Sequence, residues 1–279
     1  MMRELFPLWR RTVWGGEALM QLGYCSPGAQ PPVGEVWMCG EAPGALPPDN
    51  PLPHLPFFSK VIHSAQPLSL QVHPDQKSEF WYILHAQPDA FLYLGTAEAQ
   101  TPEALAAAAK DGTLERLLHR VNVRQGDCFY IPPGLIHAIG GGIVLWELQS
   151  CADITYRLYD YNRTDAEGKR RALHIRDAVC AYRHFSPEAL RALTFASGDT
   201  GLCCTPHFSA SLRTLSDQSV RTDSAENQWF CIDGQAVLSD RDSVLPVRRG
   251  TCVHIAAPTQ ITCTGTATFL IGTPGPPIT

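Results

Sequence analysis

Short apolar runs separated by proline and glycine constrain the fold of this chain more than any other feature. The 279 residues include 23 prolines and 22 glycines, which are spread along the whole length. Runs such as EFWYILH (79–85), DCFYIP (127–132) and GIVLWELQ (142–149) have strand length and are bounded by turn residues. This punctuation is typical of an all-β sandwich or barrel, not of repeated strand–helix units.

Helical segments are predicted at two places only. Thr101-Pro102-Glu103 combines a capping hydroxyl, a proline in the first turn and an acid, and it begins a small helical insertion at about 98–122. Ser186-Pro187-Glu188 repeats the pattern. Further strands are predicted at 34–40, 68–73, 90–95 and 153–160, and again after Thr205. The fold class is therefore all-β with short helical insertions.

A polar stretch divides the chain into two predicted domains. Residues 160–171, DYNRTDAEGKRR, have the composition of a long loop that closes a first β-sandwich. We therefore place a first β-domain at 1–165 and a smaller β-domain at 166–279.

Composition narrows the functional classes. A hydrophobic fraction of 44% supports a sizeable core, and a net charge of −5 argues against a nucleic-acid partner, though not against a small anionic substrate. We expect no membrane span and no signal peptide, because no window approaches the roughly 20 apolar residues of a span. The ten cysteines form no CxxC pair, which favours reduced, buried thiols and a cytoplasmic location.

Two segments carry residues with metal-ligating chemistry. In SLQVHPDQKSE (69–79), Gln71 and His73 point to the same side of a strand, and Glu79 opens the next strand after a tight turn. In GDCFYIPPGLIH (126–137), a turn containing Gly134 can aim His137 back into a barrel. Two imidazoles, a carboxylate and an amide oxygen suit a divalent first-row metal. Taken singly, each histidine is more often a hydrogen-bonded structural residue, so the prediction depends on the set.

Both segments resemble cupin motifs. GDCFYIPPGLIH matches the second motif, G-x5-P-x-G-x2-H, and QVH followed by Glu79 matches the first, with glutamine in place of its leading histidine. The resemblance implies a double cupin built from jelly-roll β-barrels, with the metal in the first barrel.

More specifically, the chain resembles the type I phosphomannose isomerases in their short bacterial form. The matching stretches are PLWRRTVWGGEAL (7–19), LSLQVHPD (68–75), KSEFWYIL (77–84), GDCFYIPPGLIHAIGGGIVLWELQ (126–149), DITYRLYDYNRTD (153–165) and LHIRDAV (173–179). The resemblance implies interconversion of mannose 6-phosphate and fructose 6-phosphate, usually with Zn²⁺. By matching position it implies the metal ligands Gln71, His73, Glu79 and His137, a functional Arg157, and Lys60, Ser69 and Lys77 near the substrate phosphate or sugar.

The implied chemistry needs a base and a cation. Moving a proton between C1 and C2 passes through a cis-enediol, so negative charge builds on the carbonyl oxygen, where a metal or Arg157 would stabilise it. Glu147 is the first candidate for the base, and its alternative is a structural carboxylate paired with an arginine. Asp160 and His63 are further candidates. We interpret Trp14 and Trp37 as packing residues. We interpret Arg171 as a solvated loop charge.

One departure and two alternatives stay open. The connection from Asp75 to Glu79 is shorter than in the family, which removes part of the wall of the sugar pocket. His63 also stands where the family commonly has an acid. A metal-dependent cupin acting on another sugar phosphate, or oxidising a small substrate, is one alternative. A sugar-phosphate-binding cupin without catalysis is the other, and the presence of the ligands and Arg157 argues against it.

Overall fold

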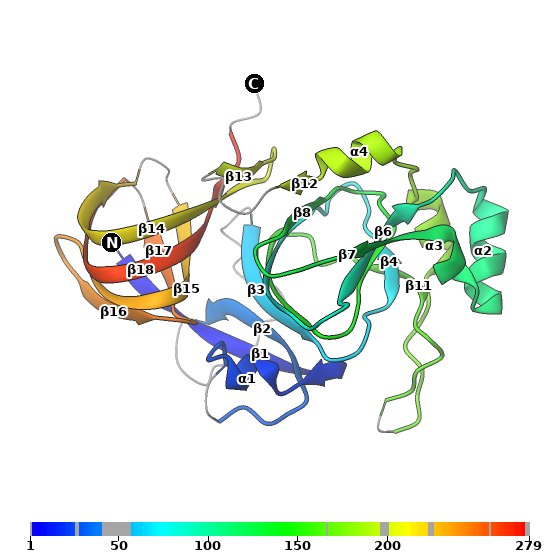
Figure 1. Ribbon diagram of the computed structural model, residues 1–279, viewed down its shortest axis with the longest axis horizontal. Helices are drawn as coiled ribbons and strands as arrows, with labels where there is room; N and C mark the ends of the chain where they lie inside the picture. The colour runs from blue at the N-terminus through cyan, green and yellow to red at the C-terminus, as the bar shows by residue number, and fades with distance from the viewer. Residues whose placement is uncertain are drawn as a thin grey trace.

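Antiparallel β-sheets form most of the molecule, as the sequence predicted (Figure 1). The computed structural model describes residues 2–25, 28–40, 57–165, 167–195, 201–222, 226–256 and 258–276. Figure 1 shows a barrel formed by the middle of the chain, with the C-terminal strands packed at one side of it and the N-terminal strands β1 and β2 below.

Thirteen of the described strands form one sheet that runs through the whole molecule. Its spatial order is β12-β8-β5-β10-β3-β2-β1-β17-β15-β18-β14-β13, and β16 pairs with β15. The strands are β1 (Met2–Gly16), β2 (Val33–Gly40), β3 (Phe57–Ser64), β5 (Glu79–Ala86), β8 (Cys128–Ile131), β10 (Ile143–Ser150), β12 (Thr194–Phe195), β13 (Gly201–Cys204), β14 (Phe208–Arg221), β15 (Glu226–Ser239), β16 (Val244–Arg248), β17 (Cys252–Ala256) and β18 (Gln260–Pro274).

A second sheet of five strands closes the barrel. Its order is β11-β4-β9-β6-β7, with β4 (Leu70–Val72), β6 (Phe91–Thr96), β7 (Leu118–Asn122), β9 (His137–Ile139) and β11 (Tyr156–Tyr159). Leu92 and Ile139 from this sheet share a core with Trp81 and Leu145 from the larger one. The two sheets therefore face each other across a common interior, which is the arrangement of a jelly-roll barrel.

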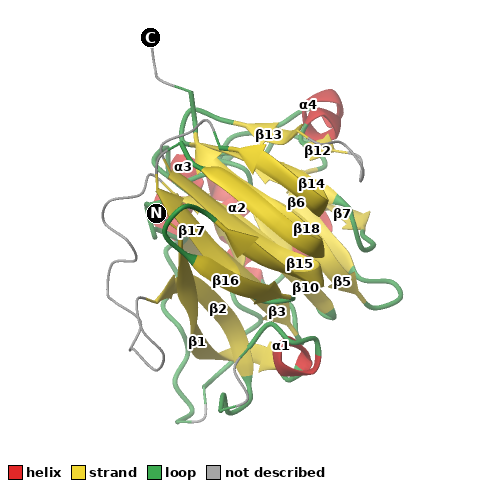
Figure 2. Ribbon diagram, turned by 90° about the vertical axis from the view of Figure 1, so that its left-hand side faces the viewer, coloured by secondary structure: helices red, strands yellow, loops and turns green. Residues whose placement is uncertain are grey.

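Strand β5 is buried on both faces, and its alternation explains why. Trp81 and Ile83 point into the barrel interior, whereas Phe80 faces the opposite side and packs in a core that includes Phe230 and Leu270 of the C-terminal strands. Successive residues of a strand point to opposite faces, so one strand contributes to both cores. Figure 2 shows the broad sheet and the C-terminal strands that continue it.

The helices are few and short, and two have the caps that the sequence predicted. They are α1 (Ala18–Gln21), α2 (Pro102–Asp111), a 3₁₀ turn η1 (Leu114–Leu117), α3 (Ile175–Ala181) and α4 (Pro187–Ala192). The hydroxyl of Thr101 accepts a hydrogen bond from the backbone N–H of Ala104, and Ser186 does the same for Ala189. No helix of the described residues is long and apolar enough to cross a membrane.

Some elements differ from the sequence prediction. The helical insertion ends at Leu117, because residues 118–122 form β7 and pair with β6. Strand β3 was not predicted: its sequence FFSKVIHS contains polar residues that are buried, because one of its faces points into the barrel. Helix α3 was also not predicted, since His174 before it makes no side-chain cap.

The predicted division at residue 165 stays a proposal. The strand pairing of β12 and of β1 indicates where a domain boundary could lie. Strand β12 pairs with β8 of the barrel, so the chain to Phe195 remains attached to it. Strand β1 pairs with β17 through Met2–Leu5 and with β2 through the rest of its length, so it belongs to both parts.

Candidate functional site

Two of the predicted metal ligands lie on neighbouring strands of the five-stranded sheet, and a third directly follows one of these strands. Gln71 on β4 lies opposite His137 on β9, and on its other side opposite Arg157 on β11. Residues directly opposite each other in an antiparallel pair have side chains on the same face. His73 follows Gln71 by two residues and therefore points the same way.

A glycine turn fastens the strand of His137 to the strand of His73. Gly134 has φ +83°, a conformation that favours glycine, and its N–H donates to the carbonyl of His73 at 2.9 Å. A Cβ at this position would lie 2.7 Å from Cγ of Arg183. The turn at Gly134 therefore sets the direction in which the chain enters β9 and His137, and a larger residue does not fit at this position.

Glu79 approaches the histidines from the other sheet. It begins β5 after a tight turn in which the N–H of Lys77 donates to the carbonyl of Pro74. The ligand atoms of His73, Glu79 and His137 all lie within 4.8 Å of one another, and all three residues are buried. The set therefore joins the two sheets across the barrel interior.

Backbone carbonyls fix the tautomers of both histidines. Nδ1 of His73 lies 3.0 Å from the carbonyl oxygen of Ile154, and Nδ1 of His137 lies 2.9 Å from that of Leu135. A carbonyl oxygen only accepts, so in each neutral ring the proton is on Nδ1 and the lone pair is on Nε2. Metal-binding histidines are commonly oriented in this way.

The contact between His73 and Glu79 lacks a proton to share. Nε2 of His73 lies 2.9 Å from Oε1 of Glu79, and both side chains are buried. Burial and the Lys77 charge lower the pKa of His73, so the ring is neutral. Burial opposes ionisation of Glu79, but the charge of Lys77, whose Nζ lies 3.0 Å from Oε1, keeps the pKa of this carboxyl below its usual value. Two electron-rich atoms thus face each other, an arrangement that a cation between them would stabilise.

The remaining predicted ligand, Gln71, lies beside this group. Its Nε2 donates to the lone pair of His137 Nε2 at 3.2 Å. A half-turn of the terminal amide would present the oxygen at the same place. Two nitrogens and two oxygens around one point fit a first-row divalent ion.

A row of side chains crosses four strands beside this group. Trp37, Lys60, Glu147 and Trp81 lie at directly opposed positions of β2, β3, β10 and β5. Nζ of Lys60 lies 3.6 Å from Oε1 of Glu147. Nε1 of Trp81 donates to Oε2 of Glu147 and to Oε2 of Glu79, each at 3.1 Å. The indole thereby links the candidate base to the candidate metal ligand.

Glu147 is buried and holds its proton more strongly than an ordinary carboxyl. Burial and the neighbouring Glu79 raise the pKa of Glu147 to about 8, against the opposing charge of Lys60. The partner of Glu147 is a lysine, so the alternative interpretation of an arginine pair does not hold among the described residues.

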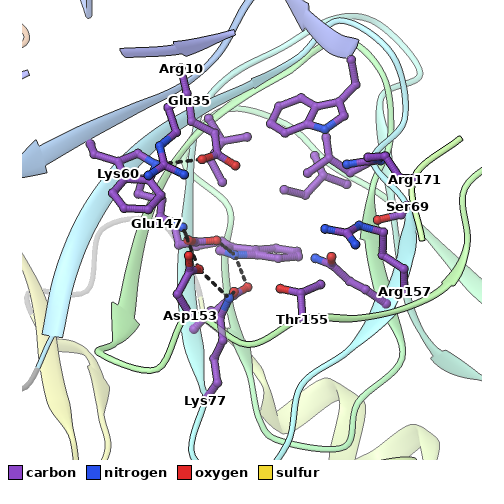
Figure 3. Close-up of a pocket in the computed structure, with 18 of the residues that line it drawn as sticks. Arg10, Glu35, Lys60, Ser69, Lys77, Glu147, Asp153, Thr155, Arg157 and Arg171 are labelled. Carbon is purple, nitrogen blue, oxygen red and sulfur yellow. Dashed lines mark hydrogen bonds and ion pairs between the residues drawn. The ribbon is translucent and has the colours of Figure 1, made fainter. Parts of the chain in front are cut away.

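A cavity of about 320 Å³ opens above these residues (Figure 3). This volume is in the range of small-molecule sites. It brings together seven of the predicted site residues, namely Lys60, Ser69, Gln71, Lys77, Glu79, Glu147 and Arg157. His73 and His137 are fully buried and do not line it. The two further candidates for the base, His63 and Asp160, do not line it.

The cavity also contains charged residues that sequence reasoning missed. Arg10, Glu35, Asp153 and Arg171 line it. Arg171, predicted to be a solvated loop charge, has a side chain only 29% exposed and is held by Asp160. Neither its local sequence nor that of Arg10 indicates a site, because their positions depend on which strands are neighbours.

Trp14 and Trp37 are buried, as predicted for packing residues, but both also line the cavity. The guanidinium of Arg10 lies 3.7 Å from the centre of the Trp37 ring. Nε1 of Trp37 donates to Oε2 of Glu35 at 2.7 Å. This cluster forms the wall contributed by β1 and β2.

A two-sheet barrel with a buried His, Glu, His group at its centre defines the cupin class. Comparisons with known proteins found a relative similar in sequence and solved structures with the same fold. No protein-family model matches the chain. Mannose-6-phosphate isomerase ManA of Bacillus subtilis is 36% identical over a match that covers 62% of this chain and 65% of the relative. The chain thus spans slightly less than two thirds of that curated relative.

Solved structures share the fold over nearly the whole chain. The mannose 6-phosphate isomerase of Bacillus subtilis superimposes with a TM-score of 0.77 at 24% identity, covering 96% of this chain and 98% of the other. A zinc-bound mannose 6-phosphate isomerase superimposes with a TM-score of 0.72 at 18% identity, covering 99% and 100%. These comparisons show that the chain shares the fold of solved mannose 6-phosphate isomerases and is similar in sequence to a curated one.

Proposed function

We propose that this chain is a metal-dependent aldose–ketose isomerase that interconverts mannose 6-phosphate and fructose 6-phosphate. Sequence similarity to a curated mannose-6-phosphate isomerase supports this pair of substrates. The observation that carries the metal dependence is the buried contact of 2.9 Å between Nε2 of His73 and Oε1 of Glu79. The spacing of the ten cysteines, which form no CxxC pair, supports a reducing, cytoplasmic location.

His73, Glu79 and His137 would hold the ion, with the Gln71 oxygen as the fourth ligand. Zinc is the proposed metal, because a structure with the same fold is zinc-bound and because the donor set is nitrogen and oxygen. When bound, such an ion supplies a positive charge that polarises a carbonyl or hydroxyl oxygen.

Glu147 is the proposed base. Its carboxylate takes the proton from C2 of the open-chain aldose, and the electrons of that C–H bond form the C1–C2 double bond of a cis-enediol. The same carboxyl returns the proton to C1, while the hydroxyl proton on O2 moves to O1. Lys60, 3.6 Å from Glu147 and almost fully buried, stabilises the ionised carboxylate that takes the proton and that forms again once the proton is returned.

Arg157 is proposed to stabilise the negative charge that develops on the carbonyl oxygen. It lies opposite Gln71 in the sheet, so its side chain points to the same face as a proposed ligand. No carboxylate among the described residues lies within ion-pair distance of it, so its charge is available to the substrate. Lys77 and Ser69, which also line the cavity, are proposed to contact the substrate.

The decisive experiment is a coupled assay that measures fructose 6-phosphate formed from mannose 6-phosphate, with and without a chelator. We expect turnover that the chelator abolishes and added Zn²⁺ restores. His137→Ala should lose both bound metal, measured by elemental analysis, and turnover.

His85→Ala is the matched control, because His85 is an exposed histidine on β5. It should keep metal and activity. Absence of turnover in the metal-loaded protein would refute the isomerase, and normal activity in His137→Ala would refute the metal centre.

A further inference from the structure

A second cavity, the outer cavity, lies outside the barrel and is rich in cationic side chains. It has a volume of about 210 Å³ and is formed where the end of β11 and the loop at 160–171 meet α2 and α3. Figure 1 shows these two helices beside β11 on the outer side of the barrel. Ala109 of α2 and Tyr159 of β11 line the outer cavity and also pack in the core between the five-stranded sheet and the helices.

The outer cavity is separate from the inner cavity, which contains Glu147 and Arg157. Among the described residues, the two cavities share one lining residue, Arg171. Asp160, which is almost fully buried, lines the outer cavity and holds this arginine. Arg171 therefore forms part of the wall between the two spaces.

The lining of the outer cavity is strongly positive. It contains four cationic side chains and one carboxylate, namely Lys110, Arg163, Arg170, Arg171 and Asp160. Four positive charges and one negative charge give a local charge of +3, although the formal net charge of the protein is −5. Like charges around so small a volume repel one another, so an anion among them would stabilise this arrangement.

The carboxylate of Asp160 cannot balance these charges alone. It accepts hydrogen bonds from Arg171 at 2.6 and 2.7 Å and from Arg163 at 2.6 Å. The guanidinium of Arg170 donates to a neutral group, the amide oxygen of Asn162, at 3.4 Å. Among the described residues, no carboxylate lies within ion-pair distance of Lys110 or Arg170. Two of the four cations are thus available to a ligand.

A buried donor also lacks an acceptor here. Nε of Arg163 is buried and has no hydrogen-bond partner in the part of the chain that the structure describes. Buried polar groups normally have partners, so this donor is left for an additional acceptor. Guanidinium and ammonium groups together suit the oxygens of a phosphoryl group, which carries about two negative charges near neutral pH.

We propose that the outer cavity is a regulatory site that binds a small phosphorylated anion, and that its occupancy lowers turnover in the inner cavity through Arg171. Burial and the charge of Arg171 lower the pKa of Arg157, so the two guanidinium groups interact. An anion in the outer cavity offsets the charge of Arg171 and reduces the positive potential at Arg157. Binding at the outer cavity is independent of the proposed reaction, and only the effect on turnover rests on it.

Calorimetric titration with inorganic phosphate and with glycerol 3-phosphate tests the site. Lys110→Met/Arg170→Met removes the two cations without a carboxylate partner, and neither lines the inner cavity. This double variant should bind phosphate at the outer cavity at least roughly 10-fold more weakly, so one class of sites should disappear from the isotherm. Lys169→Met is the matched control, because Lys169 is an exposed cation of the same loop that does not line the cavity. It should bind phosphate as the wild type does.

The two probes distinguish the sources of the phosphoryl group. Equal affinities would assign the site to free phosphate, and tighter binding of glycerol 3-phosphate would assign it to an organic phosphate ester. Equal phosphate isotherms for the wild type and the double variant would overturn the site.

Turnover at saturating mannose 6-phosphate tests the coupling, because the substrate then excludes phosphate from the inner cavity. Phosphate should lower kcat of the wild type and of Lys169→Met to a plateau, by roughly 5-fold, and should not affect kcat of the double variant. A wild-type kcat that does not respond to phosphate would overturn the coupling. If the wild type does not turn over mannose 6-phosphate at all, weaker phosphate binding in the double variant would keep the site and reject the isomerase.

Discussion

The tasks proposed for Arg157 and for the metal ligands are separable, although Arg157 and Gln71 lie on adjacent strands. The arginine donates through Nη1 to the carbonyl oxygen of Ala172 at 3.4 Å and, within the part of the chain that the structure describes, makes no hydrogen bond to His73, Glu79 or His137. Its guanidinium is half-buried, and burial together with the charge of Arg171 lowers the pKa of Arg157. Both effects make this cation more effective toward a developing negative charge.

Replacing Arg157 with alanine should therefore lower kcat by roughly 10²- to 10³-fold, the scale of losing one donor to a developing oxyanion. Metal content should be unchanged. Steady-state kinetics and elemental analysis of the same preparation check this prediction. Loss of the metal together with the activity would instead make Arg157 a structural residue of the metal centre.

Sequence alone indicated that His73, Glu79 and His137 lie together, but it did not indicate the cavity beside them. Gln71, His73 and Glu79 lie within nine residues, so the period of a strand and one tight turn are enough to bring them together. The row from Trp37 to Trp81 depends on the register of four strands, and Arg171 comes from a loop. Such contacts depend on which strands pair and in which register, and a local sequence pattern does not indicate either.

At the scale of elements, the turn at Gly134 determines where β9 begins and where His137 points. Its N–H is bound to the carbonyl of His73, and its carbonyl accepts the N–H of Arg183. The turn is thus held by both the first motif and the segment after α3. Gly168, with φ +78°, has a similar backbone conformation, but nothing lies within 4 Å of where its Cβ would be.

Gly134→Ala should lower the free energy of unfolding by more than about 1–2 kcal/mol, which is the cost of placing an alanine in the left-handed region. The added Cβ would also overlap the side chain of Arg183. It should also weaken metal binding roughly 10-fold. Gly168→Ala should show the backbone cost alone, with unchanged metal affinity. Chemical unfolding and metal titration measure both effects, and equal metal affinities in the two variants would contradict the role assigned to the turn.

The loop at 160–171 is stabilised by the ion pairs of Asp160. Burial opposes ionisation of this group, but Arg171 and Arg163 hold the pKa of Asp160 below its usual value. A depressed folded pKa contributes stability that is present above the unfolded value of about 3.9 and is lost as the pH falls below it.

Asp160→Asn should therefore destabilise the protein by about 1–3 kcal/mol at pH 7, because two guanidinium groups lose their partner. The difference from the wild type should narrow as the pH falls through about 4. Urea unfolding at a series of pH values measures it, and a difference that stays constant down to pH 3 would contradict this account.

At the scale of the whole molecule, one sheet and one shared core join the barrel to the C-terminal strands. Phe57 and Phe80 of the barrel pack with Phe208, Phe230 and Leu270. Removing either side would expose large apolar side chains, so the two parts should unfold together. A separate core, containing Phe269 and Trp229, lies within the C-terminal strands.

Phe269→Ala tests whether the two parts unfold together, because Phe269 lies in the separate core of the C-terminal strands. The lost packing, about 3–5 kcal/mol, should lower the melting temperature by roughly 6–15 °C. Metal release and calorimetric unfolding should still coincide in one transition. A first transition that leaves the metal bound would show instead that the C-terminal strands unfold on their own.

The shared strand β1 has a consequence for how the molecule is assembled during synthesis. Met2 pairs with Ile255, and Leu5 with Cys252, so these contacts join residues separated by most of the chain. Such non-local pairs form late, because a long loop must close first. A growing polypeptide can complete its barrel while this edge still lacks a neighbour, and an unpaired edge readily recruits a strand from another molecule. Intermolecular pairing at β1 is thus the characteristic error to expect when translation is interrupted before β17.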